Sequence, residues 1–179
     1  QIMLIDDSDE GWKHYAWRWK TDAAVPRPFD AQWWAGEAEE DKTLLVWGDQ
    51  GVGDQIMCAS QIPELQRRGA TVLLECDKRL ATLMERSMPG LRAFGTETPP
   101  ARALRKAKAD WQSPLSELPR HLIPDRSTRP APSGPYLMAD PEKVAAIRAR
   151  YDAMDERLKI GIAWASSNYR RPRRNAPLD

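Results

Sequence analysis

The residues most able to do chemistry lie in one short loop that carries two carboxylates and three glycines. Asp49 and Asp54 lie in this loop with Gly48, Gly51 and Gly53. A carboxylate there could accept the proton of a substrate hydroxyl or position that hydroxyl. The spacing G-x-x-G-x-G-D is neither the dinucleotide fingerprint G-x-G-x-x-G nor the phosphate loop G-x-x-x-x-G-K-[ST]. The glycines also fit a plain turn, with positive φ at Gly51 or Gly53, so a structural turn and a ligand loop both remain open.

The elements around this loop alternate between strand and helix patterns. We predict strands at 43–47, 70–76, 91–94 and 109–112, and helices from the loop to about 68 and at 78–87, 101–108 and 116–122. This alternation predicts an α/β fold with a Rossmann-like, doubly wound parallel sheet. In such sheets ligands bind at the carboxyl ends of strands, where helix N-termini offer free N–H groups to anions. The glycine loop is therefore expected at the ligand edge.

Both ends of the chain extend beyond this sheet. Residues 9–20 have helical spacing, with Trp12, Tyr15 and Trp19 on one face, and five of the eight tryptophans lie in the first 34 residues. We expect these indoles to pack the helix on the α/β domain rather than to stack on sugars. A strong helix is predicted at 140–154 and a strand at 158–165. The expected organisation is a helical element and linker over 1–35, an α/β domain over 36–139, and the start of a truncated second α/β domain over 140–179.

Composition narrows the classes of function. The formal net charge is +1, which gives no general attraction for nucleic acid, and no apolar run approaches a membrane span. The two cysteines, Cys58 and Cys76, fall within strand and helix patterns and are expected as buried reduced thiols, which favours a cytoplasmic location. With two histidines and no metal-ligand spacing, we expect neither a metal site nor a bound cofactor.

Several motifs, taken in order, resemble one bacterial family over nearly the whole chain. They are EGWKHYAWR at 10–18, WAGE at 34–37, the loop region at 44–54, QRRGA at 66–70, PLSELP at 114–119, GPYL at 134–137, and IGIAW at 160–164 with Arg173 and Arg174. They resemble tetratricopeptide-repeat proteins with a C-terminal glycosyltransferase domain. That domain is similar to the heptosyltransferases of lipopolysaccharide synthesis, whose GT-B architecture pairs two Rossmann-like domains. The resemblance implies transfer of a sugar from a nucleotide-sugar, used as a co-substrate, to a protein or glycan acceptor.

The resemblance also assigns roles to the loop residues. In heptosyltransferases a G-x-x-G-D loop after the first strand carries an Asp proposed as catalytic base, which corresponds to Asp54. Gln50 stands where that pattern has its first glycine, and Asp49 stands where the family mostly has Glu. Gly51, Gly53, Asp49 and Gln50 are then expected to contact substrate. The alternative for Asp54 is a helix cap that accepts bonds from the first N–H groups, and both roles can hold together.

A second loop is rich in hydroxyls and guanidinium groups. Ser166, Ser167, Arg170, Arg173 and Arg174 follow the predicted strand at 158–165, and arginines suit a diphosphate through bidentate contacts. By resemblance this loop contacts the donor phosphates; a solvated basic patch is the alternative. Because most of the donor-binding domain is not in the chain, we expect the isolated chain to be inactive. The competing function is a non-catalytic interaction module, in which upstream helical repeats bind a protein partner and the α/β domain is only a scaffold.

Overall fold

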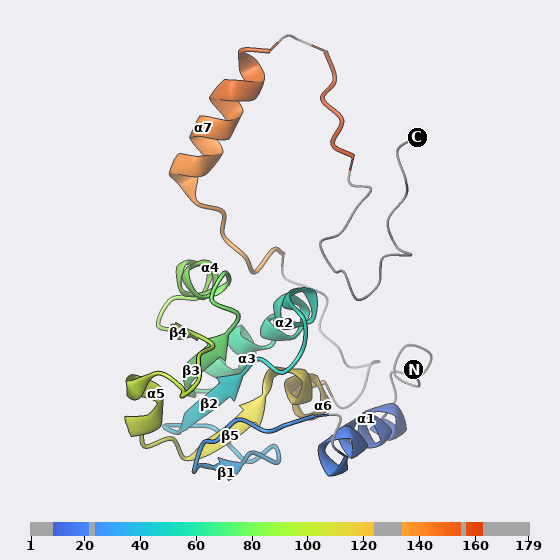
Figure 1. Cartoon of the computed structure of the whole chain (residues 1–179), viewed down its shortest axis with the longest axis vertical. Coiled ribbons are helices and arrows are strands. Elements are labelled where there is room, and N and C mark those ends of the chain that lie inside the picture. Colours follow the sequence, from blue (N-terminus) through green and yellow to red (C-terminus); the bar gives the residue numbers. More distant parts are fainter. Residues whose placement is uncertain (1–8, 22–23, 124–133, 155–156, 163–179) are drawn as a thin grey trace. The chain divides into compact units, whose positions relative to one another are not determined.

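The chain divides into two compact units, Gln1–Asp140 and Pro141–Asp179. The computed structural model of the protein describes residues 9–21, 24–123, 134–154 and 157–162. The first unit holds a five-stranded sheet with helices (Figure 1). The second holds the helix α7, Pro141–Asp152, which begins with a proline in its first turn, as the sequence predicted.

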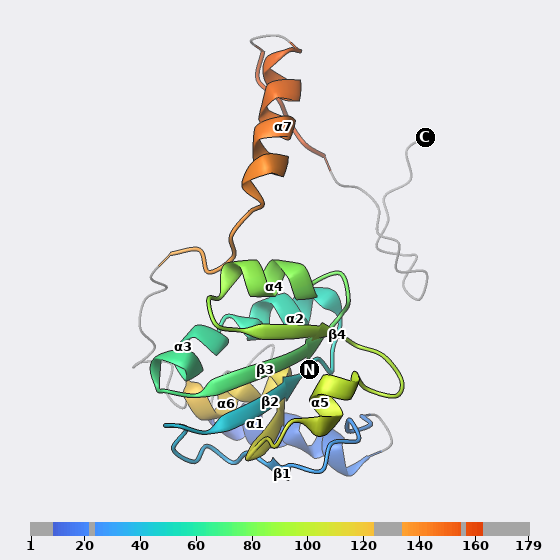
Figure 2. The same cartoon turned by 90° about the vertical axis from the view of Figure 1, so that its left-hand side faces the viewer.

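The sheet of the first unit is parallel throughout, as the alternating pattern predicted. Its strands are β1 (Gln32–Trp33), β2 (Thr43–Trp47), β3 (Thr71–Cys76), β4 (Arg92–Gly95) and β5 (Trp111–Pro114). They lie in the order β1-β5-β2-β3-β4, and Figure 2 shows β4, β3 and β2 one below another, with β1 lowest. The chain steps from β2 through β3 to β4 and then returns to the other side of β2 as β5. The order of the strands therefore reverses between β2 and β5, which is the topological switch point of the sheet.

Helices follow the strands closely, with one clear difference from the expected pattern. The elements after β2 are α2 (Val52–Ala59), α3 (Ile62–Arg67), α4 (Ala81–Ser87), α5 (Arg102–Lys106), the 3-10 turn η3 (Leu115–Glu117) and α6 (Leu118–Leu122). The single helix expected to reach about residue 68 is two helices, because Pro63 lies in the first turn of α3 and lacks the N–H that would continue α2. Gly69 follows α3 with φ +92°, the left-handed conformation expected after a helix end.

The N-terminal segment belongs to the same unit as the sheet. It forms α1 (Asp9–Ala16) and then a 3-10 turn, η2 (Trp17–Lys20), rather than one continuous helix. It also supplies β1, which sequence patterning did not predict, because two residues are too few to show a period. β1 forms by pairing with β5, Gln32 opposite Trp111 and Trp33 opposite Gln112.

Two apolar layers cover the two faces of the sheet. The first packs Leu44, Val46 and Leu74 against α2, α3, α4 and α6. The second packs Leu45, Trp47 and Leu73 against Leu104 of α5 and, from the N-terminal segment, Trp19 and Phe29. Helices on both faces of a parallel sheet are the doubly wound arrangement, consistent with a Rossmann-like fold. The fold therefore directs the carboxyl end of β2, and the loop after it, to the edge where such sheets bind ligands.

A buried ion pair fastens the linker between η2 and β1 to the second face. The Arg27 guanidinium donates to both carboxylate oxygens of Glu75 in β3, at 2.6 and 2.7 Å, and to the carbonyl of Glu97. The Glu75 side chain is completely buried. Near the other end of the linker, the Gln112 amide donates to the carbonyls of Phe29 and Ala31 and accepts a bond from the Trp47 indole. The linker is thus held at both ends.

The strand predicted at 158–165 is not formed where the structure describes it. Residues 157–162 are non-regular, with Leu158, Ile160 and Ile162 exposed, and residues 163–165 lie outside the described residues. A β-strand needs a neighbour to satisfy its backbone groups, and the described part of this unit offers no second strand. None of the helices among the described residues combines the length and the apolar character that a membrane span requires.

Candidate functional site

The glycine loop leaves β2 at the switch point and leads directly into α2. Gly51 is the residue before the first turn of α2, with φ −62° and ψ 166°, and the helix begins at Val52. Neither Gly51 nor Gly53 has positive φ, so the expectation that one of them supplies a left-handed turn is wrong. The loop turns through an ordinary extended residue. Some other requirement must explain its glycines.

Gly48 is explained by a tightly packed side chain from the next helix. A Cβ added at Gly48 would lie 2.6 Å from Cδ of Gln55. The buried Gln55 amide donates to the carbonyl of Gln50 at 2.7 Å and accepts the N–H of Asp77 at 2.8 Å. It therefore joins the loop after β2 to the end of β3. Sequence reasoning did not single out Gln55, although its place one turn into α2 was a usable signal.

Gly53 has no such structural explanation. A Cβ added there would meet nothing within 4 Å, and the residue is exposed in the first turn of α2. Alanine is favoured over glycine in a helix by roughly 0.5–1 kcal/mol. The fold would accept alanine at position 53. The bare backbone at the ligand edge leaves room for another molecule to approach closely.

Asp54 is the exposed carboxylate of the site. It lies in the first turn of α2, where the helix dipole favours negative charge, and the helix start has no side-chain capping bond. Among the described residues, its carboxylate makes no hydrogen bond or ion pair. A Cβ added at Gly51 would lie 3.2 Å from its Oδ2, so the carboxylate lies next to the open start of α2. Within the part of the chain that the structure describes, Asp54 makes no capping hydrogen bond, and the residue is exposed.

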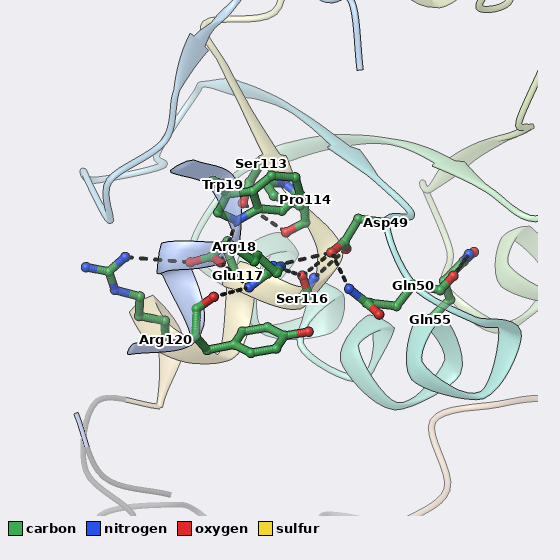
Figure 3. A network of polar contacts seen from close by, with 11 residues as sticks. Arg18, Trp19, Asp49, Gln50, Gln55, Ser113, Pro114, Ser116, Glu117 and Arg120 are labelled. Atoms are coloured by element: carbon green, nitrogen blue, oxygen red, sulfur yellow. Dashed lines mark hydrogen bonds and ion pairs between the residues drawn. The ribbon is translucent and has the colours of Figure 1, made fainter. Parts of the chain in front are cut away.

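Asp49 occupies the opposite environment, as Figure 3 shows. Its side chain is only 5% exposed, and its Oδ1 accepts the N–H of Ser116 at 3.2 Å. Its Oδ2 accepts the Ser116 hydroxyl at 2.5 Å and contacts the Arg18 guanidinium at 3.3 Å. The Gln50 amide donates to the same oxygen at 3.4 Å. Asp49 therefore holds the loop after β2 to the turn after β5, and its carboxylate is enclosed by these partners.

Arg18 brings the N-terminal segment into this network. Its Nη2 donates to the Ser116 hydroxyl at 2.5 Å, and its Nη1 pairs with Glu117 Oε1 at 3.0 Å. The guanidinium carbon lies 3.7 Å from the ring centre of Tyr15 and 4.4 Å from that of Trp19. One arginine from η2 thus contacts two buried carboxylates at the switch point and stacks between two aromatic rings. Its Nε is buried and has no hydrogen-bond partner among the described residues.

The tryptophans lie where the N-terminal segment meets the sheet. The Trp19 indole donates to Glu117 at 2.8 Å and meets Trp47 of β2 edge to face, with ring centres 5.4 Å apart. Trp33 of β1 completes the group, at 5.4 Å from Trp19 and 6.1 Å from Trp47. The segment therefore packs on the α/β unit through its indoles, as expected. Trp17 and Trp33 stay partly open, with 58% and 39% of their surface exposed.

Burial also controls the ionisation of nearby groups. Desolvation raises the pKa of Cys58 to about 12, and the Asp49 and Asp54 charges add to the effect. The pKa of Tyr15 is raised mainly by burial, against the effect of Arg18. Both groups are therefore neutral near pH 7, and neither acts as a nucleophile there. Within the described residues, no three His, Cys, Asp or Glu side chains gather in a way that could hold a metal ion.

The predicted site residues thus fall into three groups. Gly51, Gly53 and Asp54 lie together at the open start of α2, whereas Asp49 is enclosed and Gln50 contacts it. The residues predicted to hold the donor phosphates, Ser166, Ser167, Arg170, Arg173 and Arg174, lie outside the described residues. Sequence reasoning missed the parts played by Arg18, Ser116 and Glu117. The available signal was that the motifs EGWKHYAWR and PLSELP each carry polar residues that an apolar contact would not need.

Comparison with known proteins gives one distant similarity. The chain is 26% identical over 193 aligned residues to the protein FlbA of Caulobacter vibrioides, and the alignment covers 99% of this chain and 32% of FlbA. The chain thus spans about a third of the length of that relative. No family model matches the chain. No solved structure matches it.

Proposed function

We propose that this chain is the acceptor-side half of a nucleotide-sugar-dependent glycosyltransferase of GT-B architecture, with Asp54 as its general base. The observation that carries the proposal is the contrast between the two carboxylates of one loop at the switch point. Asp49 is enclosed by Ser116 and Arg18, whereas Asp54 is exposed and unpaired among the described residues. The family resemblance of the ordered motifs supports the same assignment.

The proposed reaction joins an acceptor hydroxyl to the anomeric carbon of the donor sugar. As the hydroxyl oxygen attacks, its proton passes to the Asp54 carboxylate, and the bond from the anomeric carbon to the nucleoside diphosphate breaks. The diphosphate leaves with the electron pair of that bond. A positioned general base contributes about 10²–10⁴-fold to such a step. The exposure of Asp54 allows an acceptor to reach it.

The neighbouring backbone suits the binding of a polar substrate. The first four N–H groups of a helix have no partner within the helix, and those of α2 begin beside Gly51. The side-chain-free Gly53 lets a hydroxylated substrate approach this backbone. These groups could donate to acceptor oxygens and orient the attacking hydroxyl. Gln55, through its bonds to Gln50 and Asp77, fixes the loop that presents them.

The donor is proposed to bind on the second α/β half of the GT-B architecture. The serines and arginines at 166–174 are the sequence-based candidates for the diphosphate, since arginine pairs with phosphate oxygens through two parallel N–H donors. Because FlbA is about three times as long as the aligned region, the activity is proposed for the whole protein. The isolated chain is expected to be inactive.

The direct test is release of nucleoside diphosphate by the whole protein. Uridine, guanosine and adenosine diphosphate sugars would each be incubated with the protein, with and without a lysate-derived acceptor fraction, and the released diphosphate measured. Acceptor-dependent release from at least one donor is expected. Asp54→Asn should lose this release. Its matched control is Asp30→Asn, which changes an exposed aspartate in the linker and should turn over at the wild-type rate. Absence of release from all donors, with the protein folded, would favour the interaction module instead.

A further inference from the structure

A pocket lies beside the carboxyl ends of β1 and β5, next to the Asp49 network. It has a volume of about 530 Å³, within the range of sites for small organic molecules. The N-terminal segment, the residues after β1 and the turn and helix after β5 form its walls. Its lining includes Trp19, Trp33, Trp34, Glu117, Arg120 and His121.

The aromatic part of the lining includes the two neighbouring rings of Trp19 and Trp33. Trp19 and Trp33 meet at an interplanar angle of 69°, so the two rings form a corner, and Trp33 is 39% exposed. The Trp19 indole donates to Glu117, and that of Trp34 donates to the Glu37 carbonyl. Trp34 is buried, with 4% of its surface exposed, so the flat apolar surface open to a ligand belongs to Trp33 and to the partly buried Trp19. The C–H face of a saturated ring packs well on such a surface.

The polar part of the lining is balanced in charge. Arg120 lies 3.6 Å from Glu117 and is 33% exposed, so most of its five N–H donors remain directed to solvent or to a ligand. Burial lowers the pKa of His121, so the imidazole is neutral near pH 7. Its ring packs against Trp34 at 5.0 Å, and no hydrogen bond to it is found in the part of the chain that the structure describes. The pocket therefore offers guanidinium and imidazole groups to hydroxyls without a net charge that would select an ion.

We propose that this pocket binds one pyranose ring of a glycan, which makes the acceptor a carbohydrate rather than a polypeptide. A sugar ring is neutral, apolar on its faces and hydroxylated at its edge. The lining matches it with aromatic surface and with polar groups whose charges, on Arg120 and Glu117, balance. Glu117 contacts Arg18, and Arg18 contacts Asp49, so the pocket adjoins the loop that carries Asp54. The proposal rests on the proposed transferase function for its role, but binding itself needs no turnover.

The test is binding of neutral pyranosides to the chain of 179 residues. Methyl glycosides of glucose, galactose, mannose and N-acetylglucosamine would be titrated up to about 50 mM, with saturation-transfer NMR and tryptophan fluorescence as readouts. At least one is expected to bind in the millimolar range. Arg120→Gln should weaken that binding about tenfold, the effect of losing one hydrogen bond to a charged group. The matched control is Arg86→Gln, a similarly exposed arginine with an ion pair of similar length, which should leave binding unchanged.

A second variant separates loss of binding from loss of folding. Ala35 lines the pocket and is exposed, so Ala35→Phe should fill the space without removing a packed side chain and should abolish binding. Its circular dichroism should match that of the unmodified chain. The proposal is overturned if no pyranoside binds, or if binding survives both variants. It is also overturned if the whole protein transfers sugar to a peptide while the pocket binds no pyranoside, a result that would leave the transferase function standing.

Discussion

Arg18 offers the sharpest test of how the N-terminal segment supports the candidate site. Replacing Arg18 with methionine keeps the length of the side-chain stem but removes the guanidinium. Its side chain is 13% exposed, and its two carboxylate partners, Asp49 and Glu117, are 5% and 7% exposed. The variant would leave both carboxylates buried with fewer donors. We therefore expect Arg18→Met to lower the stability of the chain strongly.

The magnitude follows from the contacts that remain. Removing one partner of a buried ion pair typically costs 3–5 kcal/mol. Ser116 would still donate to Asp49, and Trp19 would still donate to Glu117, which places the loss near the low end, about 3 kcal/mol. For a unit of this size, a loss of that order lowers Tm by roughly 10 °C.

The assay is thermal and urea unfolding of the chain, followed by circular dichroism. Lys20→Met is the matched control, because Lys20 lies in the same 3-10 turn, is exposed and rests on Trp17, and its Tm should stay within about 2 °C of the parent value. In a double-mutant cycle, Arg18→Met and Asp49→Asn should lose less together than the sum of their separate losses. Equal losses for Arg18→Met and Lys20→Met would refute the idea that the guanidinium joins the segment to the switch point.

Three further outcomes follow from the described contacts. Arg27→Met leaves the fully buried Glu75 carboxylate without its two donors and should lower the free energy of unfolding in urea by about 3 kcal/mol. The double variant Arg27→Met with Glu75→Leu should recover most of that loss, because it also removes the unpaired charge. No recovery would contradict the idea that the unpaired Glu75 charge causes the loss. Burial raises the pKa of Cys58 and of Cys76 to about 12, so a thiol reagent at about pH 8 should label both only in denaturant, and fast labelling of the native chain would contradict this. Burial lowers the pKa of His121 in the native state below its usual 6.5, so at a pH between the native and the unfolded pKa only the unfolded state binds the proton. Tm should therefore fall as the pH drops from about 7 to about 5. The Tm of His121→Gln should depend less on pH over that interval.

The core of the sheet was predictable because local patterns specify it. Residues 43–47 and 71–76 are apolar runs bounded by turn signals, and Gly69 ends a helix by its left-handed conformation. β1 was not predictable, because its two residues form a strand only by pairing with β5, far along the chain. The break between α2 and α3 could have been placed from Pro63 alone.

The sequence located the loop of the candidate site but could not tell which of its two carboxylates is exposed. Asp49 and Asp54 look alike in the loop, and only burial separates an enclosed carboxylate from an exposed one. The partners that enclose Asp49 are 31 and 67 residues away along the chain, a separation that no periodicity can reveal. The same limit applied to Gly53, whose lack of a structural reason appears only when its surroundings are known.

In the proposed reaction Asp54, and not Asp49, takes the proton of the acceptor hydroxyl. The most direct measurement compares Asp54→Asn and Asp49→Asn in the whole protein, for sugar transfer and for Tm. Asp54→Asn should lower turnover by about 10²–10⁴-fold with Tm almost unchanged, since the exposed side chain has no hydrogen-bond partner in the described residues. Asp49→Asn should mainly lower Tm, because it weakens the bonds to Ser116 and Arg18. Wild-type turnover by Asp54→Asn, with turnover lost instead in a fully folded Asp49→Asn, would contradict the account.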